Sequence, residues 1–233
     1  MQFHLIKRLL PLSLFICTSA VAANTLFIHA DSIQINYKQG KTRYTGHVRI
    51  TDQHSQLTGN QVTTHENTQK KIDRVIAQGN PANYIDHSDK NQPPLQAIAD
   101  TIHYFPLKHL TQLRNPAKAK PAQIKQGKSI LRGSTILIQK NAANQLESIT
   151  AYGTPATYHT SSIQPAFDGK ASVIKYFPKK HLITFHKHAF TKRGKTFLEG
   201  EKIQFNTKKN VLRAISDPQE KVHLAIDNPD FSK

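Results

Sequence analysis

Apolar and polar residues alternate along almost the whole chain. Ile33, Ile35 and Tyr37 recur at every second position, and Val48 and Ile50 do the same in the next segment. A period of two residues is typical of β-strands with one buried face, and no long stretch sustains the period of an α-helix. The pattern therefore predicts an all-β protein whose short antiparallel strands have one apolar and one polar face.

A β-rich unit occurs three times in the chain. Each unit has a related first segment, a glycine near its middle and a Gly-x-Pro or Ser-x-Pro segment near its end. These landmarks are Ala30-Asp31-Ser32-Ile33, Gly59 and Gly79-Asn80-Pro81; Ala99-Asp100-Thr101-Ile102, Gly133 and Gly153-Thr154-Pro155; residues 169–174, Gly200 and Ser216-Asp217-Pro218. A long repeat is one supersecondary unit stacked on copies of itself. Roughly five strands per unit give about fifteen, and the sheet has to fold over because an open sheet would leave its apolar face in water.

Glycines and prolines indicate where strands end. Gly40, Gly127 and Gly194 each stand between two polar residues, at positions where a turn with positive φ is expected. The stretch from Arg114 to Pro121 carries two prolines, so we expect one strand of the second unit to be irregular or to lie at an edge there.

The first 23 residues have the pattern of an export signal. Basic residues precede an apolar run from Leu9 to Val21, and Ala20-Val21-Ala22 offers the small residues that cleavage needs. A retained membrane anchor is the alternative, but a span needs about 18 apolar residues and this run is shorter. We therefore expect residues 1–23 to be a cleavable signal peptide and residues 24–233 to form a single domain.

The chain is strongly basic, with a formal net charge of +17, and the excess falls to 15 without Lys7 and Arg8. Cys17 would also leave with the signal, so the exported chain would have no thiol. A positive field attracts nucleic acid, phosphorylated lipid or an anionic membrane, and export removes nucleic acid. A basic surface without a partner stays an alternative. The basic residues expected at strand ends and turns, as candidates for contact with phosphate, are Lys38, Lys41, Arg43, Lys179, Lys180, Lys187, Lys192, Arg193 and Lys195.

No enzyme motif is present, because the chain lacks a nucleophile elbow, a phosphate loop, a dinucleotide fingerprint and His-Glu-x-x-His. The acidic residues are few and scattered, which argues against an exported hydrolase. His186 and His188 are expected to point from the same face of a strand, with His181 nearby, which suits two metal ligands, but no carboxylate or third His stands at a recognisable distance. We therefore predict no catalytic residue, metal or cofactor.

The motifs and their order resemble a known family. Ala30-Asp31-Ser32, Tyr37, the segment Tyr44-Thr45-Gly46-His47-Val48, and Gly79-Asn80-Pro81-Ala82 with its repeat at residues 153–158 are similar to the OstA family of periplasmic lipopolysaccharide-transport proteins. The resemblance extends from about Ala30 to Leu224, nearly all of the exported chain. Each motif is short, and the specificity comes from their order, spacing and recurrence after an export signal.

The resemblance implies a V-shaped β-jelly roll whose apolar channel holds the acyl chains of lipopolysaccharide (lipid A) in the periplasm. It also implies that end strands pair with other copies end to end, and with an inner-membrane LptC-like and an outer-membrane LptD-like protein of the same fold. The inward residues expected to line the channel are Ile33, Ile35, Val48, Ile50, Leu57, Val62, Val75, Leu113, Leu131, Ile136, Ile138, Ile149, Phe185, Leu198, Ile203 and Phe205.

The mixture of large and very small inward residues leaves two functions open. Such residues either pack by alternation or leave a groove. A groove favours a lipid carrier, whereas a filled interior favours an envelope adaptor that binds partners by strand addition and carries no lipid. A void between the inward residues would distinguish the two. A membrane-anchored member of the same pathway is a further alternative, which would need a retained N-terminal span.

Overall fold

The computed structural model describes residues 27–115, 120–215 and 221–226. The expected signal peptide, Pro116 and the landmark Ser216-Asp217-Pro218 lie outside these residues. The strands are β1 (Phe27–His29), β2 (Ser32–Asn36), β3 (Lys41–Thr51), β4 (Ser55–Glu66), β5 (Ile72–Asp86), β6 (Leu95–Phe105), β7 (Leu110–Arg114), β8 (Ala122–Gln126), β9 (Ser129–Gly133), β10 (Thr135–Lys140), β11 (Leu146–Thr160), β12 (Phe167–Phe177), β13 (Leu182–Arg193), β14 (Thr196–Asn206), β15 (Val211–Ile215) and β16 (His223–Ile226). Two short 3₁₀ helices, η1 (Pro106–Lys108) and η2 (Pro178–Lys180), follow β6 and β12.

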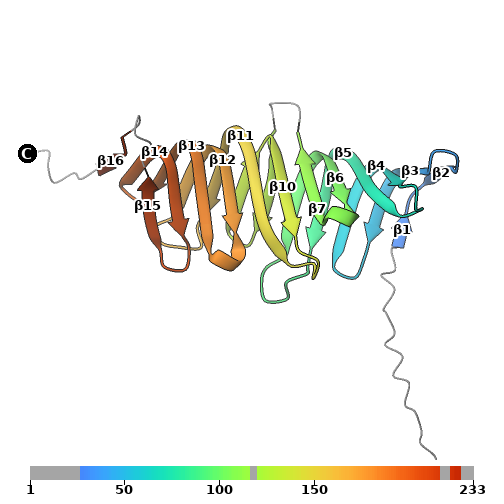
Figure 1. The fold of residues 1–233 in the computed structure, drawn as a ribbon, viewed down its shortest axis with the longest axis horizontal. Helices are drawn as coiled ribbons and strands as arrows, with labels where there is room; N and C mark the ends of the chain where they lie inside the picture. Colours follow the sequence, from blue (N-terminus) through green and yellow to red (C-terminus); the bar gives the residue numbers. More distant parts are fainter. Residues whose placement is uncertain (1–26, 116–119, 216–220, 227–233) are drawn as a thin grey trace, which may run out of the picture.

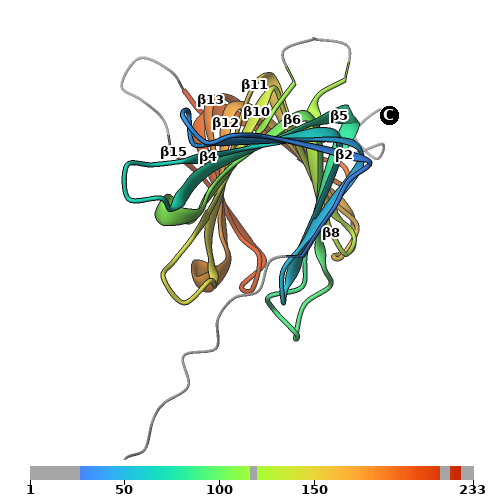
Figure 2. The same cartoon turned by 90° about the vertical axis from the view of Figure 1, so that its right-hand side faces the viewer.

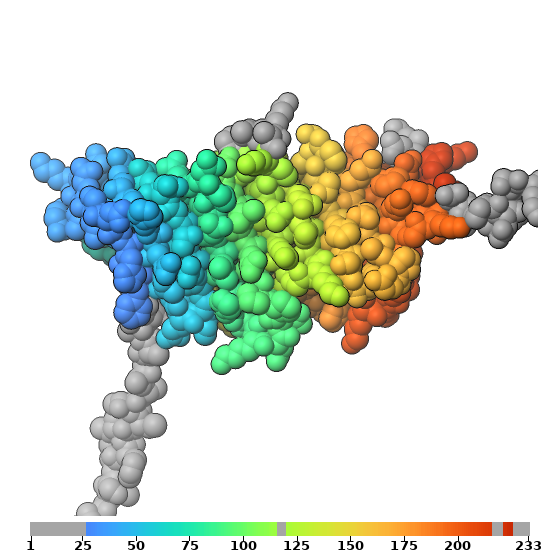
Figure 3. Space-filling model, turned by 180° about the vertical axis from the view of Figure 1, so that it is seen from behind, coloured from blue at the N-terminus to red at the C-terminus, as the bar shows by residue number. Residues whose placement is uncertain are grey.

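All of these strands belong to one 16-stranded sheet, and every pair in it is antiparallel. The strands follow one another along the long axis in nearly their chain order (Figure 1). The space-filling view shows the same progression from the N-terminal to the C-terminal end (Figure 3). The predicted all-β antiparallel architecture is confirmed.

The sheet is bent into two walls. The first wall contains β2, β7, β10 and β15, and the second contains β1, β8, β9 and β16; each of these short strands pairs with one half of a longer neighbour. The long strands β3 to β6 and β11 to β14 run through both walls. Viewed along the long axis, the walls join on one side and diverge towards the other, which gives the V shape (Figure 2).

The walls meet along a fold line where the register of the long strands shifts. Shifts occur between Thr45 and Val48, Gln78 and Ala82, and Tyr152 and Ala156, among others. Bulges of this kind bend a strand and increase its local twist. The Gly-x-Pro landmarks of the first two units lie on this line, inside β5 and β11: a Cβ on Gly79 would be 2.7 Å from the backbone nitrogen of Ala82. Only glycine therefore fits there.

The predicted turn glycines are also confirmed. Gly40, Gly127 and Gly194 have φ angles of 54°, 56° and 57°, in the left-handed region that glycine adopts without strain. In the second unit β7 ends at Arg114 and β8 begins at Ala122; residues 116–119 of the proline-containing stretch lie outside the described residues.

Inward residues form continuous apolar rows across the strands. Directly paired residues in antiparallel strands point to the same face. One row of paired residues in the first wall is Ile33, Tyr44, Val62, Ala77, Ile102, Leu113, Ile136, Ala151, Ile174, Phe185, Ile203 and Ala214. A facing row in the second wall is Ile28, Ile50, Leu57, Tyr84, Ala97, Ile124, Leu131, Tyr158, Gly169, Thr191, Leu198 and Leu224. Both rows run from one end of the sheet to the other.

Candidate lipid-binding groove

The inward residues predicted from the sequence all lie on the inner faces of the two walls. Val48, Ile50, Leu57, Leu131 and Leu198 belong to the second wall, and the others belong to the first. Most are buried; Leu198 is half-buried, and Ile33 and Ile35 are 55% and 51% exposed. These two are exposed because β2 is an end strand and has no neighbour on its outer side. Their backbone register places them on the same face as the buried rows.

The interior is not completely filled, because a cavity of about 360 Å³ lies between the walls. Ile124, Leu131 and Tyr158 line it from the second wall. The residues that line it from the first wall are Ile149, Ile174, Tyr176, Ile183 and Phe205. Its walls are thus mostly apolar, and it occupies the part of the groove between β8 and β14. A void lined in this way suits a hydrocarbon chain.

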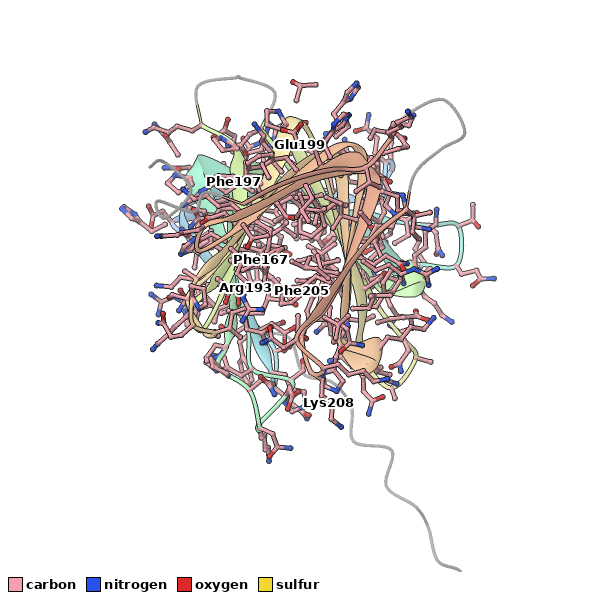
Figure 4. The ribbon with its side chains drawn as sticks, turned by 90° about the vertical axis from the view of Figure 1, so that its left-hand side faces the viewer. Phe167, Arg193, Phe197, Glu199, Phe205 and Lys208 are labelled. Atoms are coloured by element: carbon pink, nitrogen blue, oxygen red, sulfur yellow. The ribbon has the colours of Figure 1, made fainter. Side chains whose placement is uncertain are left out.

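An aromatic cluster closes the groove beside this cavity. Phe167 of β12 and Phe205 of β14 stack with their ring centroids 4.4 Å apart and their planes 17° apart. Phe185 lies 5.9 Å from Phe167, centroid to centroid, and Tyr158 lies 6.1 Å from Phe167. In the view from the C-terminal end, Phe167 and Phe205 lie centrally between the walls (Figure 4).

Sequence reasoning missed several residues of the cavity lining and of the aromatic cluster. Phe167, Tyr158, Ile124 and Ile183 were not among the predicted groove residues, although all except Tyr158 are buried. The period-two alternation indicates that Ile124 faces inward, because it lies two positions after Ala122. It indicates the same for Ile183, which lies two positions before Phe185. Phe167 follows a proline-containing loop as the first residue of its strand, so no alternation precedes it.

Glycine makes room for the cluster at one position. A Cβ on Gly169 would be only 2.3 Å from Cε1 of Phe185. Gly169 pairs with Tyr158 and Thr191 in the inward row of the second wall, so it takes the place of a side chain opposite the Phe185 ring. The ring could not occupy its position if this residue carried a side chain.

The phenol groups inside the groove stay neutral. Burial raises the pKa of Tyr84 well above its usual value, and the nearby Asp86 carboxylate raises it further. Burial also raises the pKa of Tyr158, whose hydroxyl lies 3.3 Å from Ser129 Oγ. The inner surface therefore acquires no charge from these rings at neutral pH.

A second, more polar cavity of about 670 Å³ lies at the open side of the groove, which we call the mouth. Asp86, Lys140, Lys179 and His181 are among its lining residues, and Tyr176 lines both this cavity and the apolar one. Lys179 is thus the residue of the predicted basic set that the structure places at the mouth. Its Nζ donates to Gln145 Oε1 at 3.0 Å.

A buried ion pair joins the two walls at the mouth. Lys140 Nζ at the end of β10 lies 2.6 Å from Asp86 Oδ2 at the end of β5, and the side chains are only 11% and 8% exposed. Burial alone would raise the pKa of Asp86. The hydrogen bonds from Lys140 and Ser88, together with the Lys140 charge, outweigh this effect and hold the pKa below its usual value.

In the part of the chain that the structure describes, no three His, Cys, Asp or Glu side chains are grouped so that they could hold a metal ion. Among the same residues, no helix is long and apolar enough to cross a membrane. His186 and His188 are not successive residues on one face of a regular strand, because the register shifts between His186 and Ala189, and Lys187 and His188 have positive φ angles. The expected strand geometry for this histidine pair is therefore wrong.

Comparison with known proteins gives consistent matches. A family model described as LptA/(LptD N-terminal domain) LPS transport protein matches residues 27–136 and 121–211. The lipopolysaccharide export system protein LptH of Pseudomonas aeruginosa is 30% identical over 141 residues, which are 60% of this chain and 75% of that protein. The lipopolysaccharide export system protein LptA of Haemophilus influenzae is 27% identical over 107 residues, which are 44% of this chain and 62% of that protein.

Solved structures also match, and one of them is the crystal structure of LptH from Pseudomonas aeruginosa, described as the LptA-homologous periplasmic component of the conserved lipopolysaccharide transport device. The match covers 88% of this chain and 96% of that one, with 17% identity and a TM-score of 0.27.

Proposed function

Because this chain belongs to the family of LptA and LptD N-terminal-domain lipopolysaccharide-transport proteins, we propose that it carries lipopolysaccharide with the acyl chains held between its two walls. The inward residues predicted from the sequence, from Ile33 to Phe205, would contact these chains. The protein would act as a bridge module in the periplasm and not as an enzyme. Its export would depend on the signal pattern in residues 1–23.

The observation that carries this proposal is the pair of apolar rows that face each other along the whole sheet, with a cavity of about 360 Å³ between them. Each CH₂ group removed from water contributes about 0.8 kcal/mol, so ten sheltered methylenes contribute about 8 kcal/mol. An exposed ion pair contributes about 0.2–1 kcal/mol. The groove would therefore supply most of the affinity, while the basic surface would orient the lipid.

The partners would join at the ends of the sheet. At the N-terminal end, Phe27 and Tyr37 are exposed, and at the C-terminal end Val211 and Leu224 are exposed. Unpaired strand edges with apolar side chains recruit further strands. We propose that copies of this chain join end to end there, and that one end meets an inner-membrane LptC-like protein and the other an outer-membrane LptD-like protein.

A photo-crosslinking experiment tests the lipid proposal. A photoreactive amino acid at Ile138 would face the groove, whereas one at Leu137 would face outward from the same strand. We expect lipopolysaccharide to be captured at position 138 and not at position 137. Equal capture at both positions, or none at position 138 in a folded protein, would instead favour the adaptor that binds partners by strand addition without lipid.

A further inference from the structure

The loop that connects β5 and β6, residues 87–94, lies along the mouth of the groove. We call it the strap. It is tethered to the second wall near its C-terminal end, where Gln126 Nε2 donates to the carbonyl oxygen of Pro93 at 3.2 Å. The Pro93 ring also packs on the turn after β8, since a Cβ on Gly127 would lie 3.3 Å from Pro93 Cγ.

The other end of the strap is tethered to the first wall. Asp86, which precedes the strap, forms the ion pair with Lys140, and Lys140 Nζ also donates to Ser88 Oγ at 3.1 Å. Asn144 Nδ2 lies 3.5 Å from the same Ser88 hydroxyl. Ser88 in turn donates to Asp86 from its hydroxyl and, at 2.8 Å, from its backbone N–H. The strap is therefore fixed to both walls.

The corresponding loop of the next repeat unit, residues 161–166, lacks this second attachment. Its Pro165 packs on Gly194 as Pro93 packs on Gly127, and Arg193 Nη2 donates to the Gln164 carbonyl at 3.3 Å. Thr160 pairs with the first residue of β12, as Asp86 pairs with the first residue of β6. Among the ion pairs of residues 27–115, 120–215 and 221–226, only Asp86–Lys140 joins the two walls.

The strap lies between the apolar cavity and the polar one. Gln92, Pro93 and Gln126 line both cavities, together with Tyr176. An amphiphile that fills the apolar cavity with its acyl chains must therefore place its headgroup in the mouth, beside the strap. There it meets the ammonium groups of Lys140 and Lys179 and the imidazoles of His54 and His181, which share the cavity with the carboxylates of Asp86 and Asp89.

A phosphate group competes well for these ammonium groups. It carries about −1.5 to −2 charges at neutral pH and three acceptor oxygens, against one charge and two oxygens for a carboxylate. Lys140 and Lys179 both line the mouth, so a phosphate there would draw on two ammonium groups, whereas the Asp86 carboxylate pairs with Lys140 alone. The Asp86 carboxylate would keep its hydrogen bonds from Ser88 and would become exposed to water when the strap moves.

We propose that the Asp86–Lys140 ion pair holds the strap closed across the mouth, and that a phosphorylated lipid opens it by taking Lys140 from Asp86. This rests on the proposed lipid-carrying function and adds the route by which the lipid enters. The ligand that the mouth and the apolar cavity would bind is a lipid that carries a phosphate monoester and acyl chains.

Cross-linking the strap tests whether it must open. In the full chain with Cys17→Ser, the pair Asp86→Cys and Lys140→Cys is joined by a bis-maleimide whose spacer contains a disulfide. Lipopolysaccharide loading should become at least tenfold slower and recover after reduction. In the matched control the same reagent joins Gln61→Cys to Gln78→Cys on the outer face, where the native Gln61 Nε2 donates to Gln78 Oε1 at 3.0 Å. This cross-linked control should take up lipopolysaccharide at the normal rate. Loading of the cross-linked strap at the uncross-linked rate would overturn the proposal.

Spin labels test what opens the strap. Labels at Lys90→Cys in the strap and at Glu147→Cys on the first wall, both exposed, should move apart when lipopolysaccharide is added. They should not move with inorganic phosphate alone or with lipopolysaccharide whose phosphates have been removed. Opening by phosphate alone, or by the dephosphorylated lipid, would overturn the proposed trigger. If the unlabelled wild-type protein binds no lipopolysaccharide, the proposed function itself fails; if it binds but the labels stay fixed, only the strap mechanism fails.

Discussion

Phe167 and Phe205 stack at a centroid distance of 4.4 Å although they belong to opposite walls of the groove. Phe167 is the first residue of β12 and lies at the mouth end of the second wall, whereas Phe205 lies near the end of β14 in the first wall. Neither side chain has any exposed surface. The stack therefore ties the walls together beside the apolar cavity.

Replacing Phe205 by alanine should remove this tie and enlarge the cavity. Truncating a buried phenylalanine costs about 3–5 kcal/mol of folding free energy, which urea denaturation would measure. Phe197→Ala is the matched control, because Phe197 lies on the outer face of the same strand, with Lys192 Nζ 5.2 Å from its ring centroid. Equal losses of folding free energy in the two variants would show that the stack of Phe167 and Phe205 adds no stability.

A charge on the inner face should abolish lipid binding. Ile136 is fully buried in the apolar row, whereas the neighbouring Leu137 faces outward and pairs with Gln112 and Thr150. We expect Ile136→Glu to lose lipopolysaccharide binding by at least tenfold and Leu137→Glu to retain it, as measured by co-purification of lipid. Circular dichroism serves as the control for folding. A folded Ile136→Glu variant that binds lipid normally would contradict the groove assignment.

The apolar rows could be predicted because alternation is a local property of each strand. Ile136 and Ile138 repeat at every second position, and so do Ile203 and Phe205, so their shared face follows from the sequence alone. The landmarks Gly79 and Gly153 recur at equivalent positions, and both lie on the fold line. The repeated landmarks thus coincide with the bend, although the sequence marked them only as recurring segments near the end of each unit.

The contacts between the walls could not be predicted in this way. Asp86 and Lys140 are far apart in the chain, and their distance depends on how the two walls are inclined and twisted. The same holds for Phe167 and Phe205. The alternation within a strand predicts which face a residue lies on. It does not predict which residue of the opposite wall that residue contacts. The mouth, and therefore the strap, became visible only in three dimensions.

Breaking the buried ion pair should be costly. Lys140→Met would leave the Asp86 carboxylate buried without its partner, and such changes cost about 3–5 kcal/mol. The double variant Asp86→Leu, Lys140→Met should recover most of this stability because it buries no unpaired charge. Urea denaturation of the single and double variants gives the coupling between the two residues. Additive effects would show that the pair does not act as a unit.

Acid should weaken the fold through His103. Burial lowers the pKa of His103, and the charges of Arg114 and Arg74 lower it further. The unfolded chain then binds a proton at a higher pH than the folded chain, so stability falls as the pH drops from about 6.5 towards the lower folded pKa. His103→Gln should lose less stability between neutral pH and pH ~5, as thermal denaturation would measure. An unchanged pH dependence would exclude this contribution.

The open N-terminal end should be the site where another copy joins. Ile33 and Ile35 continue the inward rows of the first wall, yet both are more than half exposed because no strand follows β2 on its outer side. A second copy that pairs with β2 would bury them, and inward charges on an edge strand prevent such pairing. Their exposure also means that replacing them should disturb the isolated protein little.

We therefore expect the double variant Ile33→Asp, Ile35→Asp to stay monomeric at concentrations where the wild-type protein associates, as light scattering coupled to gel filtration would show. Gln34→Asp is the matched control, because Gln34 lies on the opposite face of the same strand and pairs with Arg43; it should associate normally. The double variant should keep the circular dichroism of the wild type, because neither side chain is buried. If it associates as the wild type does, β2 is not the joint, and the exposed edge formed by β15 and β16 would have to join copies without it.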